Sequence, residues 1–493
     1  LLMNYKVIGP PGTGKTHTLL EKVKEYIDNG TPLARIGYFA FTRKAAYEAR
    51  DRFLKEFPNL NKKDLKYFQT LHSFTFNYLG LREEDVIQEE HYRSIGETIG
   101  VRINYANYEK NEYNGIFTSN SEYLNIVNLA RVKKISALDQ LDHNEHLGKI
   151  ERDKLDIISK EIDSYKKTYH LIDFTDMIQK FINCGHCPEF DVIFIDEAQD
   201  LSLIQWGMVK KLQEYSKDIY VAGDDDQAIF GWAGADVESF INFDAKEIPL
   251  TQSNRIPTEV QEIALKIISK IDNRINKTYK PRDELGSINL VFSINQLDMS
   301  KGTWLILART NELIRGLIPI LKKKGIYFES KSGRSISESL YRDILNWEKW
   351  RKGGKLNTIE ITRIFERMDK QFKETLDKEF TLEEVGIKEK GSWYDVFTAV
   401  SPQMSAYIRS MRINGEDLRV PPRVKISTIH GAKGGEAENV ALLQDQTANT
   451  LKASKKSISK QDEEHRVWYV GVTRAKQNLF LIRGKDRRKE YKI

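Results

Sequence analysis

The segment that most constrains the fold is Gly9-Pro10-Pro11-Gly12-Thr13-Gly14-Lys15-Thr16, which fits the phosphate-loop pattern G-x-x-x-x-G-K-[ST] at every defined position. It follows an apolar run and opens a helical period that ends at Gly30. Glycines let backbone N–H groups turn toward phosphate oxygens, and a helix N-terminus adds partial positive charge. We therefore predict a nucleoside-triphosphate site, in which Lys15 reaches the β- and γ-phosphates and the Thr16 hydroxyl holds Mg²⁺.

A pair of acidic residues supplies the second part of this site. Asp196 and Glu197 directly follow the apolar run Val192–Ile195. A carboxylate at the C-terminal end of a parallel strand lies in the ligand crevice of an open α/β sheet. Asp196 therefore suits the Mg²⁺ site, and Glu197 is placed to orient or deprotonate the attacking water. These residues indicate a nucleoside triphosphatase but not what the hydrolysis drives.

Short apolar runs alternate with helical stretches and predict an α/β fold with parallel sheets. Two regions break the alternation, at about 80–172 and 346–422, and both are interpreted as mainly helical insertions. In the first, Leu155, Ile158, Ile162, Tyr165 and Tyr169 predict one face of an amphipathic helix. The predicted strands are Tyr5–Ile8, Ile36–Phe41, Val192–Ile195, Ile219–Ala222, Trp304–Leu307, Val424–Ile426, Val440–Leu443 and Leu479–Ile482.

Length and composition exclude several classes of protein. The 493 residues correspond to about three compact units, and 40% of them are hydrophobic, which is enough to build cores of that size. No uncharged apolar run approaches the length of a membrane span, and the N-terminus carries no signal-peptide pattern. With 77 basic and 71 acidic residues the net charge is +6, which permits an anionic partner such as nucleic acid without requiring one.

The chain has two cysteines, Cys184 and Cys187, in a C-x-x-C arrangement. Two cysteines exclude a disulfide framework and fit a reducing cytoplasm. A zinc site would need two further ligands, and no second cysteine pair exists. Ordinary thiols in a loop are the favoured interpretation, and a redox pair stays open as the alternative.

Seven segments stand in a fixed order along the chain: Phe39–Ala46, Thr70–Phe74, Asp196–Asp200, Gly223–Trp232, Ser253–Arg255, Thr428–Gly434 and Tyr469–Ala475. In this order they resemble motifs Ia, Ib, II, III, IV, V and VI of the UvrD/Rep-type superfamily 1 (SF1A) DNA helicases. The resemblance covers nearly the whole chain. A single motif of this kind is weak evidence, whereas seven in the right order are specific.

The resemblance implies two tandem RecA-like domains with parallel sheets, with ATP between them and a helical insertion in each. We expect the first RecA-like domain at 1–80 and 173–252, with its insertion at 81–172. We expect the second at 253–345 and 423–493, with a short insertion at 346–422. Members of the family move along single-stranded DNA, typically 3′ to 5′, and displace the paired strand.

The same resemblance assigns roles around the triphosphate. Gln227 is positioned to hydrogen-bond the γ-phosphate and the attacking water. Arg255 and Arg474 resemble arginine fingers, which neutralise charge in the transition state and would reach the phosphates when the domains close. Glu436 stands where the family has a nucleotide-binding glutamate. The expected cofactors are ATP and Mg²⁺.

Candidate DNA contacts divide into aromatic and polar residues. Aromatic rings stack on bases without sequence preference, and polar side chains contact backbone phosphates. For the aromatic residues the alternative is burial in a core, and for each histidine it is a structural role. The stacking candidates are Phe41, Phe230 and Trp232, and the phosphate-contact candidates are Thr42, His72, Arg309, Thr428 and His430.

Three positions depart from the family pattern. Asn254 stands where a tyrosine often stacks on adenine, Ala233 where motif III often has an arginine, and Gly435 where motif V often has a bulky residue. The segment that reads adenine in the family is missing upstream of the first strand, so either the N-terminus is incomplete or recognition of the base is relaxed. The preference for ATP over other nucleoside triphosphates therefore stays open, and we expect one DNA contact fewer.

The leading hypothesis is an ATP-dependent helicase that acts on single-stranded and tailed duplex DNA. We expect a prokaryotic-type or viral protein that is cytoplasmic and associated with the nucleoid. Replication or repair proteins are possible partners, and no membrane is expected to be involved. One alternative is a DNA-stimulated ATPase that displaces proteins or remodels junctions with little unwinding. Another is a nucleotide-gated DNA-binding scaffold. An RNA substrate is a lesser alternative, because stacking and phosphate contacts discriminate RNA from DNA only where the 2′-OH is sensed.

Overall fold

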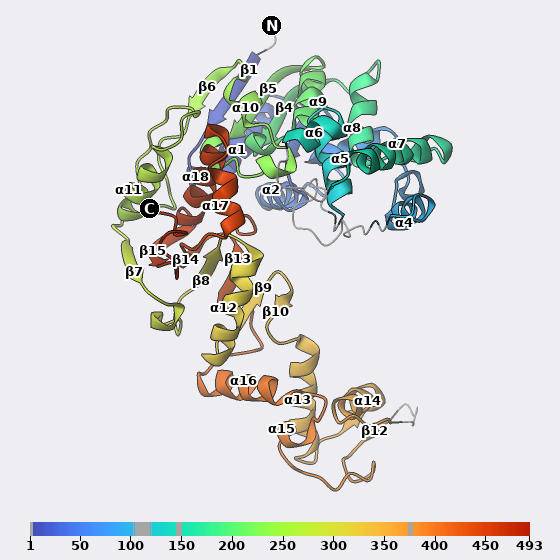
Figure 1. Cartoon of the computed structure of the whole chain (residues 1–493), viewed down its shortest axis with the longest axis vertical. Helices are drawn as coiled ribbons and strands as arrows, with labels where there is room; N and C mark the ends of the chain where they lie inside the picture. The colour runs from blue at the N-terminus through green and yellow to red at the C-terminus, as the bar shows by residue number, and fades with distance from the viewer. Residues whose placement is uncertain (1–2, 102, 104–118, 120, 144–149, 373–377) are drawn as a thin grey trace. The chain divides into compact units, whose positions relative to one another are not determined.

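Residue contacts divide the chain into two compact units in this computed structural model (Figure 1). The structure describes residues 3–101, 103, 119, 121–143, 150–372 and 378–493. Unit 1 comprises Leu1–Ile256, Ile267–Arg282 and Ser457–Tyr469, and unit 2 comprises Pro257–Lys266, Asp283–Lys456 and Val470–Ile493. Each unit groups an α/β core with an insertion, and the four-part domain boundaries predicted above stay predictions.

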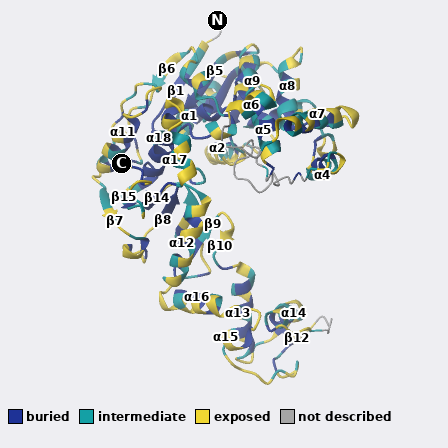
Figure 2. Ribbon diagram, in the orientation of Figure 1, coloured by how far each residue is buried: buried dark blue, intermediate teal, exposed yellow. Residues whose placement is uncertain are grey.

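Unit 1 is built on a six-stranded parallel sheet with the order β3-β2-β4-β5-β1-β6. The four predicted strands of this region are confirmed, and their side chains are almost entirely buried (Figure 2). The strands missed by the sequence prediction, β3 and β6, are short edge strands with polar residues. The strands are β1 (Met3–Ile8), β2 (Ile36–Ala40), β3 (Phe68–Thr70), β4 (Phe190–Asp196), β5 (Ser216–Gly223) and β6 (Lys246–Pro249).

Helices cover this sheet and form the first insertion (Figure 1). In α1 (Lys15–Asp28) the predicted apolar face is confirmed by the burial of Leu19, Leu20 and Val23, and the chain leaves the helix at Gly30 with φ +86°. The other helices of unit 1 are α2 (Arg43–Glu56), α3 (Leu71–Tyr78), α4 (Glu89–Thr98), α5 (Glu122–Val132), α6 (Ala137–His143), α7 (Arg152–Thr168), α8 (Phe174–Asn183), α9 (Leu203–Gln213) and α10 (Val237–Ile241). Two helices have residues in both units, α11 (Thr258–Ile268) and α18 (Ile458–Val472).

The first insertion is helical where it is described, as predicted; residues 102, 104–118, 120 and 144–149 lie outside the described part. Leu155, Ile158 and Ile162 of α7 are buried in its core. The prediction was wrong for Tyr169, which is 60% exposed because α7 ends at Thr168.

A buried ion-pair network joins two helices of this insertion, α5 and α7, to α8, which directly follows it. Asp173 begins α8 as its N-cap residue and accepts hydrogen bonds from Arg131 of α5 and from Lys166 of α7, the latter at 2.8 Å. Lys166 also lies 2.8 Å from Asp176. Burial raises the pKa of Asp173, but the charges of Arg131 and Lys166 outweigh this effect and hold it well below its usual range. The network therefore fixes the packing of α5, α7 and α8.

Replacing Lys166 with methionine is expected to destabilise this insertion by about 3 kcal/mol, because it leaves buried carboxylates short of a compensating charge. Urea unfolding followed by circular dichroism measures the loss, and hydrogen exchange locates it in α5, α7 and α8. The exposed Lys160→Met, which removes a surface pair with Asp156, is the control and should change stability by less than about 1 kcal/mol. Equal effects of the two substitutions would contradict the prediction.

Unit 2 contains a seven-stranded sheet with the order β10-β9-β13-β8-β14-β15-β7. Its pairs are parallel except β9 with β10, and the predicted strands of this half are confirmed. The α/β fold class with parallel sheets in two tandem units is therefore confirmed. The strands are β7 (Ser287–Val291), β8 (Trp304–Ala308), β9 (Phe328–Ser330), β10 (Gly333–Arg334), β13 (Val424–Thr428), β14 (Ala437–Leu443) and β15 (Ala475–Ile482).

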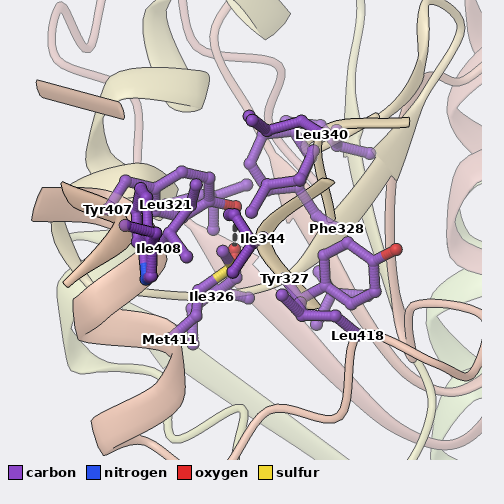
Figure 3. Close-up of a cluster of buried hydrophobic side chains, with 14 of the residues drawn as sticks. Leu321, Ile326, Tyr327, Phe328, Leu340, Ile344, Tyr407, Ile408, Met411 and Leu418 are labelled. Atoms are coloured by element: carbon purple, nitrogen blue, oxygen red, sulfur yellow. Dashed lines mark hydrogen bonds between the residues drawn. The ribbon is translucent and has the colours of Figure 1, made fainter. Parts of the chain in front are cut away.

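The second insertion shares one hydrophobic core with this sheet. Figure 3 shows side chains of α12, β9, α13 and α16 in contact, and the Tyr407 hydroxyl donates to the Ile326 carbonyl at 2.6 Å. Residues 373–377 lie outside the described part. The helices are α12 (Asn311–Lys323), α13 (Glu338–Trp350), α14 (Thr358–Arg367), α15 (Trp393–Val396), α16 (Pro402–Ile413) and α17 (Ala448–Ser454), and β11 (Leu356–Asn357) pairs with β12 (Glu379–Phe380). Among the described residues, no helix is long and apolar enough to cross a membrane.

Candidate nucleotide and DNA site

The three segments of unit 1 that are predicted to bind nucleotide leave the sheet at the same edge. The phosphate loop follows β1, Asp196 ends β4, and the segment from Asp224 to Gln227 follows β5. Strand β5 lies between β1 and β4, so parallel pairing brings all three carboxyl ends together. This edge is where ligands bind in open α/β sheets.

The phosphate loop is closed by its own hydrogen bonds. The Thr13 hydroxyl donates to the Pro10 carbonyl at 2.8 Å, and Lys15 Nζ donates to the Gly9 carbonyl at 2.8 Å. Gly14 adopts φ +84° as the N-cap of α1, which directs the first N–H groups of the helix toward the loop. The loop therefore has the backbone donors and the cation that a triphosphate requires.

The segment Ser253–Arg255 packs directly on this loop, within unit 1. The Ser253 hydroxyl donates to the Pro11 carbonyl at 2.8 Å, and the Asn254 N–H donates to the Gly12 carbonyl at 2.9 Å. Gly12 has φ +76°, and a Cβ there would lie 2.4 Å from Arg255 Cβ. Glycine is thus required both by the backbone and by the approach of Arg255, which belongs to the same unit as the loop.

Oxygen donors suited to Mg²⁺ meet beside the loop. Asp196 Oδ2 accepts from the Thr16 hydroxyl at 2.7 Å and from the buried Tyr38 hydroxyl at 2.8 Å. Hydroxyl and carboxylate oxygens are the ligands that Mg²⁺ prefers, with water and substrate phosphates completing its shell. Burial, together with the neighbouring charge of Glu197, raises the pKa of Asp196. The residues present fit the predicted Mg²⁺ site, and Tyr38 is a member that the sequence reasoning missed because it resembles a core strand residue.

A hydrogen-bonded chain connects Glu197 to Gln227. Gln199 Nε2 donates to Glu197 Oε2 at 2.6 Å, and Gln199 Oε1 accepts from the Asp224 N–H at 3.1 Å. Gln227 Nε2 donates to Asp224 Oδ2 at 2.8 Å. A Cβ at Gly223 would lie 2.5 Å from Gln199 Oε1, so glycine there admits the bridging amide. One hydrogen-bond network therefore holds both Glu197, the predicted general base, and Gln227, which is predicted to contact the γ-phosphate.

Two predicted nucleotide-binding residues lie in unit 2. Arg474 is buried and donates from Nε to the Val470 carbonyl at 3.0 Å and from Nη1 to the Gly435 carbonyl at 3.3 Å. Glu436 is exposed and lies 3.2 Å from Lys476. Their contacts with nucleotide stay predictions.

The stacking candidates differ in exposure. Phe41 and Phe230 are buried and stack on each other with centroids 5.7 Å apart, whereas Trp232 is 46% exposed. Stacking of Phe41 or Phe230 on DNA would require their rings to become exposed. Trp232 presents a ring to solvent in this structure and is the strongest of the three candidates.

The polar candidates lie at strand ends and helix starts. Thr42 is the N-cap of α2, accepting from the Ala45 N–H at 3.1 Å. In unit 2, Thr428 ends β13 opposite the end of β8, accepts from the Gly431 N–H at 3.0 Å, and is half-buried. Arg309 and His430 follow these two strands and are also half-buried. Their DNA contacts stay predictions.

His72, in α3, packs edge-on against Phe174 with ring centroids 5.8 Å apart. Burial and the positive charge of Arg43 lower the pKa of His72 to about 4. The imidazole is therefore neutral at physiological pH, and a contact with phosphate would be a hydrogen bond rather than an ion pair.

Because the pKa of His72 is depressed in the folded state, the unfolded state binds more protons, and stability should fall as pH decreases from 6.5 toward 4. We expect His72→Asn to reduce this pH dependence. Urea unfolding between pH 7 and 4.5 measures it, and an NMR titration of the imidazole should give a midpoint near 4. A midpoint near 6.5 would contradict the lowered pKa of the half-buried His72.

The cysteine pair follows α8 and lies near no metal-binding cluster in the described part of the chain. Burial raises the pKa of Cys187 to about 12. A protonated thiol is a poor nucleophile, which favours ordinary thiols over the redox alternative.

Comparison with protein families accounts for nearly the whole chain. The model described as the UvrD/REP helicase N-terminal domain matches residues 2–247. The model described as the UvrD-like helicase C-terminal domain matches residues 237–486. Both α/β units therefore fall within matched domains.

Several curated proteins are similar at low identity. The ATP-dependent DNA helicase PcrA of Leuconostoc citreum is 23% identical over 375 residues, covering 67% of this chain and 48% of the relative. DNA helicase II of Haemophilus influenzae is 24% identical over 321 residues, covering 61% of this chain and 43% of the relative. A probable DNA helicase of Mycoplasma pneumoniae is 26% identical over 303 residues, covering 54% of this chain and 53% of the relative. The chain spans about half the length of the curated relatives it matches.

Proposed function

Because the chain belongs to the UvrD/Rep-type family of DNA helicases, we propose that it is an ATP-dependent helicase that moves along single-stranded DNA and separates duplexes. The observation that carries the proposal is the shared network at the sheet edge. Thr16 and Asp196 are in contact beside the phosphate loop, and Glu197 and Gln227 are linked through Gln199 and Asp224.

In this proposal the residues of unit 1 bind the triphosphate and direct water. Lys15 leaves the Gly9 carbonyl to contact the β- and γ-phosphates, and the N-terminus of α1 supplies backbone donors. Thr16 and Asp196 would hold Mg²⁺, which neutralises phosphate charge when bound. Glu197 orients and deprotonates the water, and Gln227 contacts the γ-phosphate.

Two arginines complete the proposed charge stabilisation. Arg255 lies against the phosphate loop through the packing of its Cβ near Gly12. Arg474 is proposed as the second arginine finger, acting when nucleotide is bound. Each would neutralise charge that develops on the transferred phosphoryl group.

For DNA, we propose that Trp232 stacks on a base. The DNA backbone is proposed to contact Thr42, Arg309, Thr428 and His430, with neutral His72 as a hydrogen-bonding partner.

Replacing Trp232 with alanine should weaken binding of single-stranded oligonucleotides about tenfold, because one stacked base contributes about 1–3 kcal/mol. Fluorescence anisotropy measures the affinity. Tyr169→Ala, which removes an exposed ring from the first insertion, is the matched control. An unchanged affinity of the Trp232 variant would remove this residue from the DNA path.

Direction is tested with tailed duplexes. We expect ATP-dependent separation of a 3′-tailed duplex, with much slower separation of a 5′-tailed duplex and none without ATP. A parallel assay follows the release of a protein bound to the tail. Release of protein without strand separation would replace the helicase proposal by the protein-displacement alternative, and ATP binding without turnover would favour the nucleotide-gated scaffold. A cytoplasmic, nucleoid-associated location and partners in replication or repair stay predictions.

A further inference from the structure

Three consecutive aspartates precede Gln227, the residue proposed to contact the γ-phosphate, and are completely buried. Asp224, Asp225 and Asp226 each have 0% exposure, and Gln227 follows them directly. Burying an ionised carboxylate is costly, and adjacent like charges increase the cost. This segment therefore requires compensating cations.

Lys277 supplies the central cation. Its Nζ lies 2.5 Å from Asp225 Oδ1, 2.8 Å from Asp226 Oδ2 and 3.1 Å from Asp224 Oδ1, and its side chain is 6% exposed. Burial alone would lower the pKa of Lys277, but the three carboxylates outweigh burial and raise it above its ordinary value. One ammonium group thus holds all three aspartates.

Other groups of unit 1 fix the rest of the cluster. Arg274 donates to both oxygens of Asp226, at 2.8 and 2.6 Å, and the Ile275 N–H donates to Asp225 Oδ2 at 2.8 Å. Arg466 donates to the Asp225 carbonyl at 2.8 Å. Lys277 and Arg274 neutralise two of the three carboxylates, and the buried guanidinium of Arg466 beside the Asp225 carbonyl supplies a third positive charge.

Of Lys277 and Arg274, Lys277 is the one connected to the proposed catalytic groups. It contacts Asp224 Oδ1, while Asp224 Oδ2 accepts from Gln227 Nε2 at 2.8 Å. The Asp224 N–H donates to Gln199, which holds Glu197. The described contacts of Arg274 with this cluster are to Asp226. Lys277 therefore orients, through Asp224, the carboxamide that is proposed to meet the γ-phosphate.

We propose that Lys277 is a positioning residue for ATP hydrolysis, acting through Asp224 on Gln227. This inference rests on the proposed function. A positioning role and a purely structural role make different predictions. If Lys277 acts through Gln227, replacing Lys277 should have no further effect on turnover in a protein that already lacks the Gln227 side chain.

A double-mutant cycle tests this requirement. The kcat and KM of DNA-stimulated ATP hydrolysis are measured for the wild type, Lys277→Met, Gln227→Ala and the double variant. We expect Lys277→Met to lower kcat about 30-fold with KM changed less than about threefold, and the double variant to match Gln227→Ala within about threefold. Lys277→Arg should restore most of the lost kcat. Losses that multiply in the double variant would overturn the proposal.

Controls separate positioning from folding. Lys166→Met removes another buried lysine held by two aspartates, outside the site, and should leave kcat unchanged for the folded protein. If Lys277→Met does not fold, the same cycle is run with Asp225→Asn added, which restores the net charge of the cluster, and the same criterion applies. A wild-type protein without ATPase activity would instead defeat the proposed function.

Discussion

Replacing Lys15 with alanine is expected to lower kcat for DNA-stimulated ATP hydrolysis by about 10³-fold or more, because it removes the cation that meets the β- and γ-phosphates. The backbone donors of the phosphate loop and α1 remain. Binding of ATP should therefore weaken less than turnover. Phosphate release measures kcat, and a fluorescent ATP analogue measures binding.

The Lys15 variant should fold normally. The hydrogen bond from the Nζ ammonium to the Gly9 carbonyl contributes about 1.5–3 kcal/mol, which is less than the total stability of a folded domain. Lys22→Ala, which removes a partly exposed lysine paired with Glu25 on the same helix, is the matched control and should hydrolyse ATP at the wild-type rate. Turnover by the Lys15 variant within tenfold of wild type would show that the triphosphate binds elsewhere.

The arrangement of the nucleotide site in unit 1 was largely predictable from the sequence. Continuous apolar runs identified β1, β4 and β5, and parallel pairing necessarily brings their carboxyl ends together. Asp196 at the end of β4, and the segments after β1 and β5 that carry Lys15 and Gln227, then lie at one edge. Local pattern and a general rule of sheet geometry were sufficient for these positions.

The residues that connect this site were not predictable in the same way. Lys277 lies far along the chain from Asp224, in a polar stretch where lysines are usually solvent-exposed, and only the tertiary fold brings it to the aspartates. Gln199 lies inside a recognised motif, but its two hydrogen bonds depend on the approach allowed by Gly223. Hydrophobic periodicity predicts which face of a helix or strand is buried, but it does not predict which polar side chains pair across the fold.

Elements at the margins of the fold were missed for a related reason. The edge strands β3 and β6 are short and contain polar residues, so neither forms the continuous apolar run that predicts a strand, although Phe68 and Thr70 of β3 are buried. Burial of Phe41 and Phe230 also depends on their mutual stacking, which sequence spacing does not specify. The sequence therefore specifies the central strands more reliably than the edge strands or the exposure of the predicted DNA-contact residues.

Replacing Glu197 with glutamine is expected to lower kcat by about 10²–10³-fold while ATP and DNA affinities stay close to wild type, because the base is lost and the shape is kept. The glutamine carbonyl can still accept from Gln199. Single-turnover hydrolysis and equilibrium binding measure the two effects. Glu214→Gln, at an exposed site paired with Lys211, is the control. Wild-type turnover by the Glu197 variant would mean that another group activates water.

The backbone of Glu197 gives an independent test that this side chain is kept for function. Its φ of 56° lies in the left-handed region, which costs a non-glycine residue about 1–2 kcal/mol. Glu197→Gly and Glu197→Ala both lose the carboxylate and the bond to Gln199, so they differ in backbone strain. Both should be inactive, and the glycine variant should be more stable by about 1 kcal/mol in urea unfolding. Equal stability of the two variants would contradict a strain of this size, because alanine also gains from the lower entropy of its unfolded chain. The expected order would mean that the fold retains an unfavourable conformation at the residue proposed to activate water.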